Sequence, residues 1–452
     1  MKHAKNIHLL VLLILIKANG FAQPALAIET EKKVDNYLAP LLENDLISGS
    51  VLIAKNGEIL VSKGYGLANR EFDIPCSANT KFRLASVSKQ FTAMAIMILE
   101  EKGLLKTSDT LTKYIPGYPE GEKITIHNLL THTSGVINYS ALSDHYDTWC
   151  KHHTIEQVIE RFKNKPLRFQ PGEKFEYSNS GYVLLANIIE KVSGNSFEEF
   201  ITENIFRPLE MHDSGIDTHT EIIKNRAAGH YNTGKQIVQA DYLYVPYTNG
   251  AGSIYSTVDD LYKWDRALYT EKLISKKSIE KMFTPYIQTY GYGWFIREEF
   301  GKKLIEHRGG LNGFLTMIQR YTDDDVLVIT LFNYVSPFVR ELNRGIAAIA
   351  LGVDYEPILI PGGVQIKPEV LLQYAGKYLL GEDYIVNIAV ENDKVFYSDI
   401  ELNKVELIAQ NDVKFYLPAN ISIIRFIKEK DGAIKGIMVQ QHENSFMGKK
   451  IE

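Results

Sequence analysis

The chain has 452 residues, and 45% of them are hydrophobic, so it carries enough apolar side chains for more than one buried core. Its formal net charge is −5, from 50 basic and 55 acidic residues. This balance excludes the basic footprint of a nucleic-acid-binding protein and the polybasic segment of a membrane-surface anchor.

The N-terminus has the pattern of a secretory signal peptide. Lys2 and Lys5 precede the apolar run LLVLLILI, and the small residues of KANGFAQ follow it. This run is well short of the roughly 20 residues that a membrane-spanning helix needs. We therefore expect residues 1–22 to be cleaved off, near Ala22–Gln23. The mature protein is expected to be periplasmic or secreted, with no stable membrane span.

Two cysteines remain in the mature chain, Cys76 and Cys150. They can form one bridge in an oxidising compartment, but one bridge is not a disulfide framework. The sequence leaves their pairing open.

The secondary-structure pattern changes twice along the first 350 residues. A β-hairpin is predicted at 48–66, where two β-rich runs flank the turn pair Asn56–Gly57. From Ser86 onward the apolar spacing is helical, and TIHNLLTHTSG, TIEQVIERF and TVDDLYKWDRAL each begin with a threonine that can cap a helix. Strand patterns return in YGYGWFI, KKLIEH, GFLTMIQRY and DVLVITLFN, and PFVRELNRGIAAIALG is typical of a helix.

We therefore predict an α+β fold for this region. One antiparallel sheet is built from residues near 30–80 and 285–335, and a helical domain is inserted between them. Helices from the two termini are expected to cover the faces of the sheet.

A predicted domain boundary follows this α+β region. The segment DYEPILIPGGVQIKPEV contains three prolines and two glycines, which is typical of a linker. Beyond it, short alternating runs such as YIVNIAV, KVFYS and SIIRFI predict a small all-β, barrel-like domain. The expected organisation is a catalytic domain over 28–352, with an α/β part at about 28–80 and 285–352 and a helical part at about 84–280, then a linker over 353–368 and the all-β domain over 369–452.

The first candidates for chemistry are Ser86 and Lys89, in FRLASVSKQFTAMAIMIL. A Ser-x-x-Lys pattern alone is weak evidence, because Ser278 and Lys281 repeat it in the charge-dense segment ISKKSIEKMF, where both side chains are expected to face water. After Lys89, in contrast, the sequence is apolar on nearly all sides, which predicts a buried helix.

Two interpretations of the first pair compete. In the structural one, Ser86 caps the helix and Lys89 extends to solvent. In the catalytic one, the free N–H groups and the dipole at the start of the helix favour a serine alkoxide, and Lys89 lies one turn along on the same face. A partly dry site would lower the pKa of Lys89 and let it accept the serine proton. On this pair alone, the structural interpretation ranks first.

A second element supports the catalytic interpretation. Tyr177 and Asn179, in KFEYSNSGYVLLANIIE, precede a predicted helix. A phenol near a lysine or histidine can shuttle a proton, and an asparagine amide can hold a substrate amide. The similar triplet from Tyr247 to Asn249 is interpreted as a loop, because no buried helix follows it directly.

The third element is His307, at the end of the predicted strand KKLIEH and before Arg308-Gly309-Gly310. A basic side chain on a strand, followed by glycines, allows a ligand backbone to pair along the strand edge. His132, in LLTHTSGV, is the alternative histidine, but its loop suits a hydrogen-bonded structural role.

Metal and cofactor motifs are missing from the sequence. His152-His153 lacks a third ligand at metal spacing. Neither a glycine-rich phosphate loop nor a Gly-x-Ser-x-Gly elbow occurs. We therefore expect no metal and no cofactor.

Taken in order, Ser86-x-x-Lys89, Tyr177-x-Asn179 and His307-Arg-Gly309 resemble the three motifs of serine β-lactamases and penicillin-binding proteins. The second and third are similar to those of class C β-lactamases, D-alanyl-D-alanine carboxypeptidases, D-aminopeptidases and related esterases. LLTHTSGV, PLEMHDSG and GAGSIYSTVDDLYKW also resemble accessory segments of that group. The resemblance covers residues from about 30 to 350 and implies a β-lactamase/transpeptidase-like fold. The tail from YAGKY onward is similar to lipocalin-like C-terminal domains.

The resemblance implies an acyl-enzyme mechanism. Ser86 would attack a carbonyl, with Lys89 as the base or with Lys89 and Tyr177 sharing the proton. Tyr177 would protonate the leaving group and later activate water. His307 would supply a positive charge or a proton relay beside Tyr177.

The resemblance also implies the residues that bind the substrate, namely Asn179, Gly309 and Gly310. Asn179 would bind the substrate amide. The backbone N–H groups of Ser86 and Gly310 would form the oxyanion hole.

The third motif departs from that of the β-lactamases, which usually present Lys-Thr-Gly with a hydroxyl that helps to hold the substrate carboxylate. Here Arg308 takes the middle position, and strand alternation directs it away from the side of His307. We therefore expect a serine hydrolase of a D-amino-acid peptide or an ester, with a small-molecule or peptide substrate and no nucleic-acid partner. A β-lactamase proper and a non-turnover sensor of β-lactams or peptidoglycan stay open, as does the oligomeric state.

Overall fold

The computed structural model describes residues 24–452, apart from 233–235, 335–337, 359–363, 365, 382, 401, 418–421, 430–431 and 442–443. The expected signal peptide over 1–22 lies outside the described residues, as does part of the expected linker. In the part that is described, no helix is both long and apolar enough to cross a bilayer. Cys76 is buried, Cys150 is exposed, and both are free thiols.

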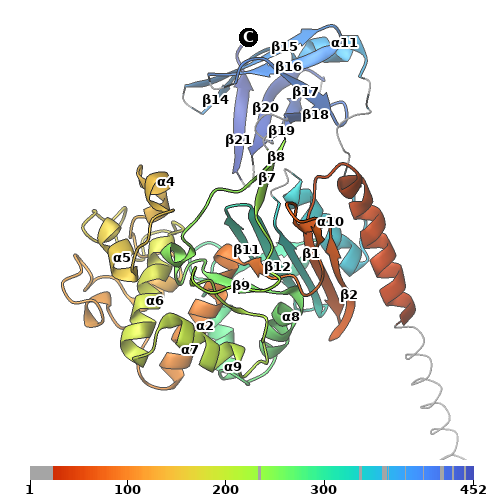
Figure 1. Cartoon of the computed structure of the whole chain (residues 1–452). Coiled ribbons are helices and arrows are strands. Elements are labelled where there is room, and N and C mark those ends of the chain that lie inside the picture. Colours follow the sequence, from red (N-terminus) through yellow and green to blue (C-terminus); the bar gives the residue numbers. More distant parts are fainter. Residues whose placement is uncertain are drawn as a thin grey trace, which may run out of the picture.

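A six-stranded antiparallel sheet lies in the larger domain, in the order β10-β11-β12-β13-β1-β2 (Figure 1). Its strands are β1 (Gly49–Lys55), β2 (Glu58–Tyr65), β10 (Phe295–Glu299), β11 (Lys302–Leu311), β12 (Phe314–Tyr321) and β13 (Val326–Phe332). β1 and β2 form the predicted hairpin, and Asn56 and Gly57 both have the positive φ that a tight two-residue turn requires. Because β1 also pairs with β13, early and late segments of the chain meet in one sheet, which confirms the predicted fold class.

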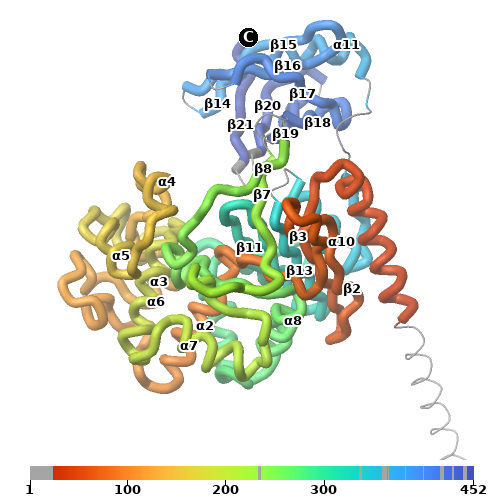
Figure 2. Tube along the Cα trace, viewed as in Figure 1, coloured from red at the N-terminus to blue at the C-terminus, as the bar shows by residue number. Residues whose placement is uncertain are grey.

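Side chains alternate along the sheet between two cores. In β1, for example, Val51 faces one core and Leu52 the other. The first core is covered by a helix over residues 24–43 and by α10 (Val339–Leu351), which lie side by side (Figures 1 and 2). The expectation that these two terminal helices cover both faces is wrong. Both lie on one face, because α8 (Val258–Ala267) of the inserted part occupies the other.

The inserted part is mainly helical. Its helices are η1 (Ala85–Ser88), α2 (Lys89–Glu101), η2 (Leu111–Lys113), α3 (Ile126–Leu130), η3 (Tyr139–Ala141), α4 (His145–Thr148), α5 (Ile155–Lys163), α6 (Asn179–Ser193), α7 (Phe197–Ile201), η4 (Thr202–Phe206), η5 (Val245–Thr248), α8 and α9 (Lys276–Met282). Short strands lie before and among them: β3 (Leu67–Asn69), β4 (Ile74–Pro75), β5 (Phe82–Arg83), β6 (Gly215–Ile216), β7 (His230–Asn232), β8 (Ile237–Gln239) and β9 (Ile254–Ser256).

Local sequence signals account for several of these helices. Thr125, Thr154 and Thr257 each accept a hydrogen bond from the backbone N–H three residues along, so the expected caps of α3, α5 and α8 are present. In α2, every residue from Lys89 to Leu99 is buried, in keeping with its apolar pattern.

The C-terminal region forms a closed antiparallel barrel of eight strands. After α11 (Pro368–Leu371) and η6 (Leu372–Tyr374) come β14 (Gly376–Leu380), β15 (Tyr384–Glu391), β16 (Lys394–Ser398), β17 (Val405–Ala409), β18 (Lys414–Leu417), β19 (Ser422–Lys428), β20 (Ile434–Gln441) and β21 (Asn444–Lys450). An apolar cluster packs the described barrel residues together. The barrel contacts the start of α10, where Tyr416 packs near Phe338 and Lys414 pairs with Glu341.

A buried ion pair joins the helical part to the sheet. Oδ1 of Asp265, on α8, lies 2.5 Å from Nε of Arg320, on β12, and both side chains are at most 1% exposed. We predict that Asp265→Ala lowers the free energy of unfolding by about 3–5 kcal/mol, because the guanidinium then stays buried without this counter-charge. Equilibrium unfolding in urea measures the loss.

The control is Glu203→Ala, which breaks an exposed ion pair with Arg207. Such surface pairs contribute about 0–1 kcal/mol, so this variant is expected to unfold close to the wild type. Equal losses for the two variants would contradict the role given to the buried pair.

Candidate active site

Ser86 and Lys89 lie where the sheet meets the helical part. The sequence predicts a helix that starts at Ser86, but a 3-10 turn spans Ala85–Ser88 and the α-helix starts at Lys89. Ala85 has a left-handed φ of 49°, a strained conformation for alanine. A hydrogen bond of 3.0 Å joins Nζ of Lys89 to Oγ of Ser86. Neither η1 nor α2 starts with a side-chain cap, so the capping interpretation of Ser86 has no support.

Lys89 is fully buried and has three oxygen neighbours. Besides Ser86, its Nζ bonds to Oδ1 of Asn179 and to the carbonyl oxygen of Ala251, each at 2.9 Å. Desolvation lowers the pKa of Lys89 well below the usual value for lysine. A neutral amine has two N–H donors and one lone pair. It can therefore donate to Asn179 and Ala251 and, at the same time, accept the proton of Ser86.

The loop before α6 carries Tyr177, and the first residue of α6 is Asn179; both lie beside Lys89. The ring centroid of Tyr177 lies 4.9 Å from Nζ of Lys89. Asn179 is held on both sides: its backbone N–H donates to Oδ1 of Asn138, and its Nδ2 donates to Oγ of Ser140, each at 3.1 Å. These bonds orient the amide so that its oxygen faces Lys89.

His307 lies on β11, and both of its ring nitrogens are hydrogen-bonded. Nδ1 is 2.7 Å from the carbonyl oxygen of Arg308, and Nε2 is 3.0 Å from the hydroxyl of Tyr290. Burial, reinforced by the nearby Lys89, lowers the pKa of His307 to about 3. Burial therefore favours a neutral imidazole near neutral pH, which does not supply the expected positive charge; the other expected role of His307, a proton relay beside Tyr177, stays a prediction. Its ring centroid lies 6.3 Å from that of Tyr177, so the two residues are brought together.

β11, the strand that carries His307, extends further than its neighbour β10. β10 pairs with residues 302–306 of β11, and the register between these two strands ends before His307. Arg308 lies away from His307, as strand alternation predicts. It is exposed and, with Met317, lines a cavity of about 920 Å³ between the sheet, α10 and the barrel.

Gly309 is needed where β11 approaches the turn of Ser86. A Cβ atom at this position would lie 2.3 Å from the carbonyl oxygen of Leu84 and 2.9 Å from the backbone nitrogen of Ser86. Thr316, on β12, donates a hydrogen bond of 2.7 Å to the same carbonyl. A Cβ at Gly310 would meet its nearest neighbour at an ordinary 3.6 Å, so sterics do not require glycine there.

Two residues of the site, Ala251 and Tyr290, escape prediction from the sequence, whereas His132 has the hydrogen-bonded structural role that its loop predicts. Ala251 acts through its carbonyl, and only the accessory segment GAGSIYSTVDD pointed to its neighbourhood. Tyr290 begins YGYGWFI, which indicates only a strand. His132 was expected to be structural: its Nδ1 accepts the backbone N–H of Ser178 at 3.1 Å, and its ring centroid lies 4.2 Å from that of Tyr177. The histidine therefore supports the Tyr177 loop directly.

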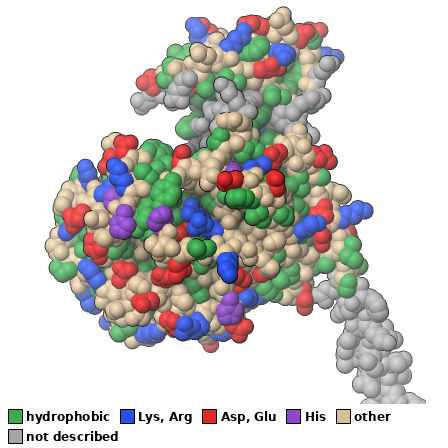
Figure 3. Space-filling model, in the orientation of Figure 1, with side chains coloured by type: hydrophobic (Ala, Val, Ile, Leu, Met, Phe, Trp, Pro, Cys, Tyr) green, Lys and Arg blue, Asp and Glu red, His purple; other side chains and the backbone are tan. Residues whose placement is uncertain are grey.

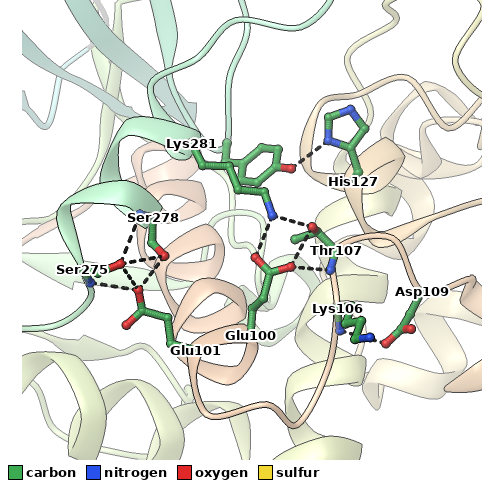
Figure 4. A network of polar contacts seen from close by, with 10 residues as sticks. Glu100, Glu101, Lys106, Thr107, Asp109, His127, Ser275, Ser278 and Lys281 are labelled. Carbon is green, nitrogen blue, oxygen red and sulfur yellow. Dashed lines mark hydrogen bonds and ion pairs between the residues drawn. The ribbon is translucent and has the colours of Figure 1, made fainter.

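The second Ser-x-x-Lys pair lies at the far end of α2, on α9 (Figure 4). Oγ of Ser278 donates to Oε1 of Glu101 at 2.5 Å, and Nζ of Lys281 donates to Oε2 of Glu100 at 2.7 Å. The expectation that both side chains simply face water is corrected: each binds a carboxylate. Lys281 therefore has a counter-charge, unlike the desolvated amine of Lys89.

The tyrosine and the asparagine of the second Tyr-x-Asn triplet form hydrogen bonds with neighbouring side chains of the helical part. Tyr247 is fully buried in η5, and its hydroxyl lies 3.3 Å from Nδ1 of His145. Oδ1 of Asn249 accepts a bond from Oγ of Ser253 at 2.9 Å. Both contacts fit the structural interpretation of this segment.

The described residues contain no group of three or more His, Cys, Asp or Glu side chains placed to hold a metal ion. The two adjacent histidines make separate contacts. The ring of His152 packs near Tyr244, while Nε2 of His153 lies 3.2 Å from the carbonyl oxygen of Thr148.

Comparison with known proteins identifies the relatives of this chain. A family profile described as Beta-lactamase matches residues 32–351. Penicillin-binding protein 4* of Bacillus subtilis (strain 168) is 30% identical over 437 residues, which are 90% of this chain and 96% of the relative. The structure of the octameric penicillin-binding protein homologue from Pyrococcus abyssi has a TM-score of 0.67 and 28% identity, and the match covers 93% of this chain and 99% of that one.

A D-amino acid amidase from Ochrobactrum anthropi SV3, solved as a complex with L-phenylalanine, shares the fold. Its TM-score is 0.64 at 22% identity, and the match covers 72% of this chain and 98% of that one. The region matched by the family profile contains all three motifs, from Ser86 to Gly309. The chain therefore belongs to the beta-lactamase family of serine hydrolases.

Proposed function

We propose that the domain assigned to residues 28–352 acts through an acyl-enzyme on an amide or ester, with Ser86 as the nucleophile. The observation that carries this proposal is the 3.0 Å hydrogen bond between Ser86 and the fully buried Lys89. A serine hydroxyl is a weak nucleophile unless an adjacent base activates it. Because burial favours the neutral amine of Lys89, a base lies within hydrogen-bond reach of the hydroxyl.

In acylation, Oγ of Ser86 forms a bond to the substrate carbonyl carbon, and its proton moves to the lone pair of Nζ of Lys89. We assign this step to Lys89 rather than Tyr177, because Lys89 already holds the hydroxyl. The carbonyl electron pair moves to oxygen, and the backbone N–H groups of Ser86 and Gly310 stabilise the oxyanion. Each donor of this kind is typically worth about 10²–10³ in rate. Asn179 is assigned to hold both Lys89 and the substrate amide.

The leaving group then departs as the carbonyl forms again. Tyr177 donates a proton to the leaving amine or alkoxide and regains one from the ammonium of Lys89. In deacylation, water attacks the acyl carbon while Tyr177 passes its phenol proton to the free amine of Lys89 and takes a proton from the water. The ammonium of Lys89 then returns its proton to Oγ of Ser86 as the acyl–oxygen bond breaks, which restores the free enzyme. The position of the Tyr177 ring against Lys89 supports this relay. His307 is assigned as an uncharged imidazole that packs beside Tyr177.

We infer that the acyl donor is a D-amino-acid peptide or an ester rather than a β-lactam. The third motif has no hydroxyl residue, and its middle side chain, Arg308, lines the cavity on the other side of the strand. A site without that hydroxyl lacks one hydrogen bond to the carboxylate of a bound β-lactam. The fold shared with a D-amino acid amidase is compatible with this substrate class.

We also infer export to the periplasm or the medium, on the strength of the signal-like pattern over 1–22 and the kinship with penicillin-binding proteins. We assign a small molecule or a peptide as the substrate that this protein binds. On the face shown in Figure 3, acidic and basic side chains are interspersed over both domains, so this face offers no extended basic field for a polyanion.

The nucleophile can be identified by covalent labelling. A fluorophosphonate is expected to add once to the wild type, and intact mass followed by peptide mapping should place it on Ser86. Ser86→Ala should lose the adduct, because no activated hydroxyl remains. Ser278→Ala is the matched control, since it removes the serine of the other Ser-x-x-Lys pair, and it should label like the wild type. An adduct that persists in Ser86→Ala would remove the assignment.

The substrate class can be tested with four compounds: a chromogenic cephalosporin, a D-Ala-D-Ala peptide, a D-amino-acid amide and a short-chain ester. We predict a higher kcat/KM for at least one of the last three than for the cephalosporin, because the third motif lacks the carboxylate-binding hydroxyl. Fastest turnover of the cephalosporin would identify a β-lactamase instead. Acylation without turnover of any compound would favour the sensor interpretation.

A further inference from the structure

Tyr290 and His307 form a buried phenol–imidazole pair next to the proposed nucleophile. The hydroxyl of Tyr290 lies 3.0 Å from Nε2 of His307, and Nδ1 of His307 lies 2.7 Å from the carbonyl oxygen of Arg308. A carbonyl oxygen can only accept, so Nδ1 carries the ring proton and Nε2 has the lone pair. The phenol therefore donates to Nε2. Both ring nitrogens are satisfied while the imidazole is neutral, whereas a proton on Nε2 would break the bond that Tyr290 donates.

The titratable groups around His307 and its partner Tyr290 come from several elements. They are Lys89 of α2, His132 of the loop after α3, Tyr177 of the loop before α6, Tyr182 of α6, Tyr290 of the segment before β10, and Arg308 of β11. The charge of Arg308, and that of Lys89 whenever its amine is protonated, opposes protonation of His307. His132 is neutral as well, because its Nδ1 accepts a backbone N–H and burial lowers its pKa.

A neutral His307 matters for acylation because of the charge that develops on Lys89. When Nζ of Lys89 takes the proton of Ser86, a positive charge appears in a dry site. A second positive charge on His307 would repel it, and this repulsion is much stronger inside a protein than in water. A neutral imidazole at His307 does not repel the positive charge that develops on Lys89.

We propose that Tyr290 is a positioning residue that holds His307 as the neutral Nδ1–H tautomer, so that no positive charge stands beside Lys89 during acylation. Tyr290 touches neither Ser86 nor the reacting atoms in this assignment and acts through His307. The inference rests on the proposed function for its catalytic consequence. The hydrogen bond and the tautomer that it fixes can be tested without turnover.

The first experiment measures the tautomer and titration of His307 by ¹⁵N NMR of histidine-labelled protein, with the resonance assigned by its loss in His307→Gln. The wild type should show the Nδ1–H tautomer and stay neutral well below the ordinary histidine pKa of about 6.5. In Tyr290→Phe, His307 should titrate about one unit or more higher, because the neutral form loses its donor to Nε2. The wild-type spectrum is informative even if this variant does not fold.

The second experiment measures the pH profile of Ser86 acylation by the fluorophosphonate. Tyr290→Phe should lower the acylation rate most at the acid end of the profile, where a proton on His307 adds to the protonation of Lys89, and should leave the alkaline plateau near the wild-type rate. Tyr292→Phe is the matched control, because Tyr292 makes the same kind of bond, 2.7 Å long, to Nδ1 of His127. It should change neither the titration of His307 nor the profile.

Three results would overturn the proposal: an Nε2–H tautomer in the wild type, an unchanged His307 titration in Tyr290→Phe, or a rate loss in that variant that is equal at every pH. The last of these would mark Tyr290 as a structural residue only. If the spectra are as expected but Ser86 of the wild type is never acylated, the tautomer assignment stands and the proposed function fails.

Discussion

The burial of Lys89 is the constraint on which the site depends. Burial disfavours the charged ammonium, so the folded protein favours a free amine where an exposed lysine would be protonated. That amine needs partners for two N–H groups and a lone pair. Asn179, Ala251 and Ser86 supply them, and they come from α6, the turn after η5 and the turn before α2. Three separate segments must therefore pack correctly before a base exists.

The second constraint is the close approach of β11 to the turn that carries Ser86. Gly309 allows the backbones to come together, and Thr316 ties the strand next to it to the carbonyl of Leu84. Ala85 is held in a strained conformation at the same contact. The nucleophile thus lies at a junction between the sheet and the helical part. Neutral histidines near Tyr177 complete a site that is polar but carries little charge.

Much of this arrangement follows from local patterns in the sequence. The hairpin at Asn56–Gly57, the threonine caps and the buried character of α2 depend on short-range signals, and the structure contains all three. The order of three spaced motifs pointed to residues that the fold brings together. The role of Ala251 is carried by a backbone carbonyl, which no side-chain pattern reveals. The partner of His307, Tyr290, and the shared face of the two terminal helices depend on long-range packing.

The central claim is that Lys89 is a neutral amine at the pH where the enzyme works. It is tested most directly by titrating the side-chain resonances of labelled lysine, with Lys89 assigned by its absence in Lys89→Met. Because burial lowers its pKa, Lys89 should be neutral at neutral pH and become protonated only as the pH falls through that lowered value. A Lys89 that stays charged up to the ordinary lysine pKa of about 10.4 would contradict the account.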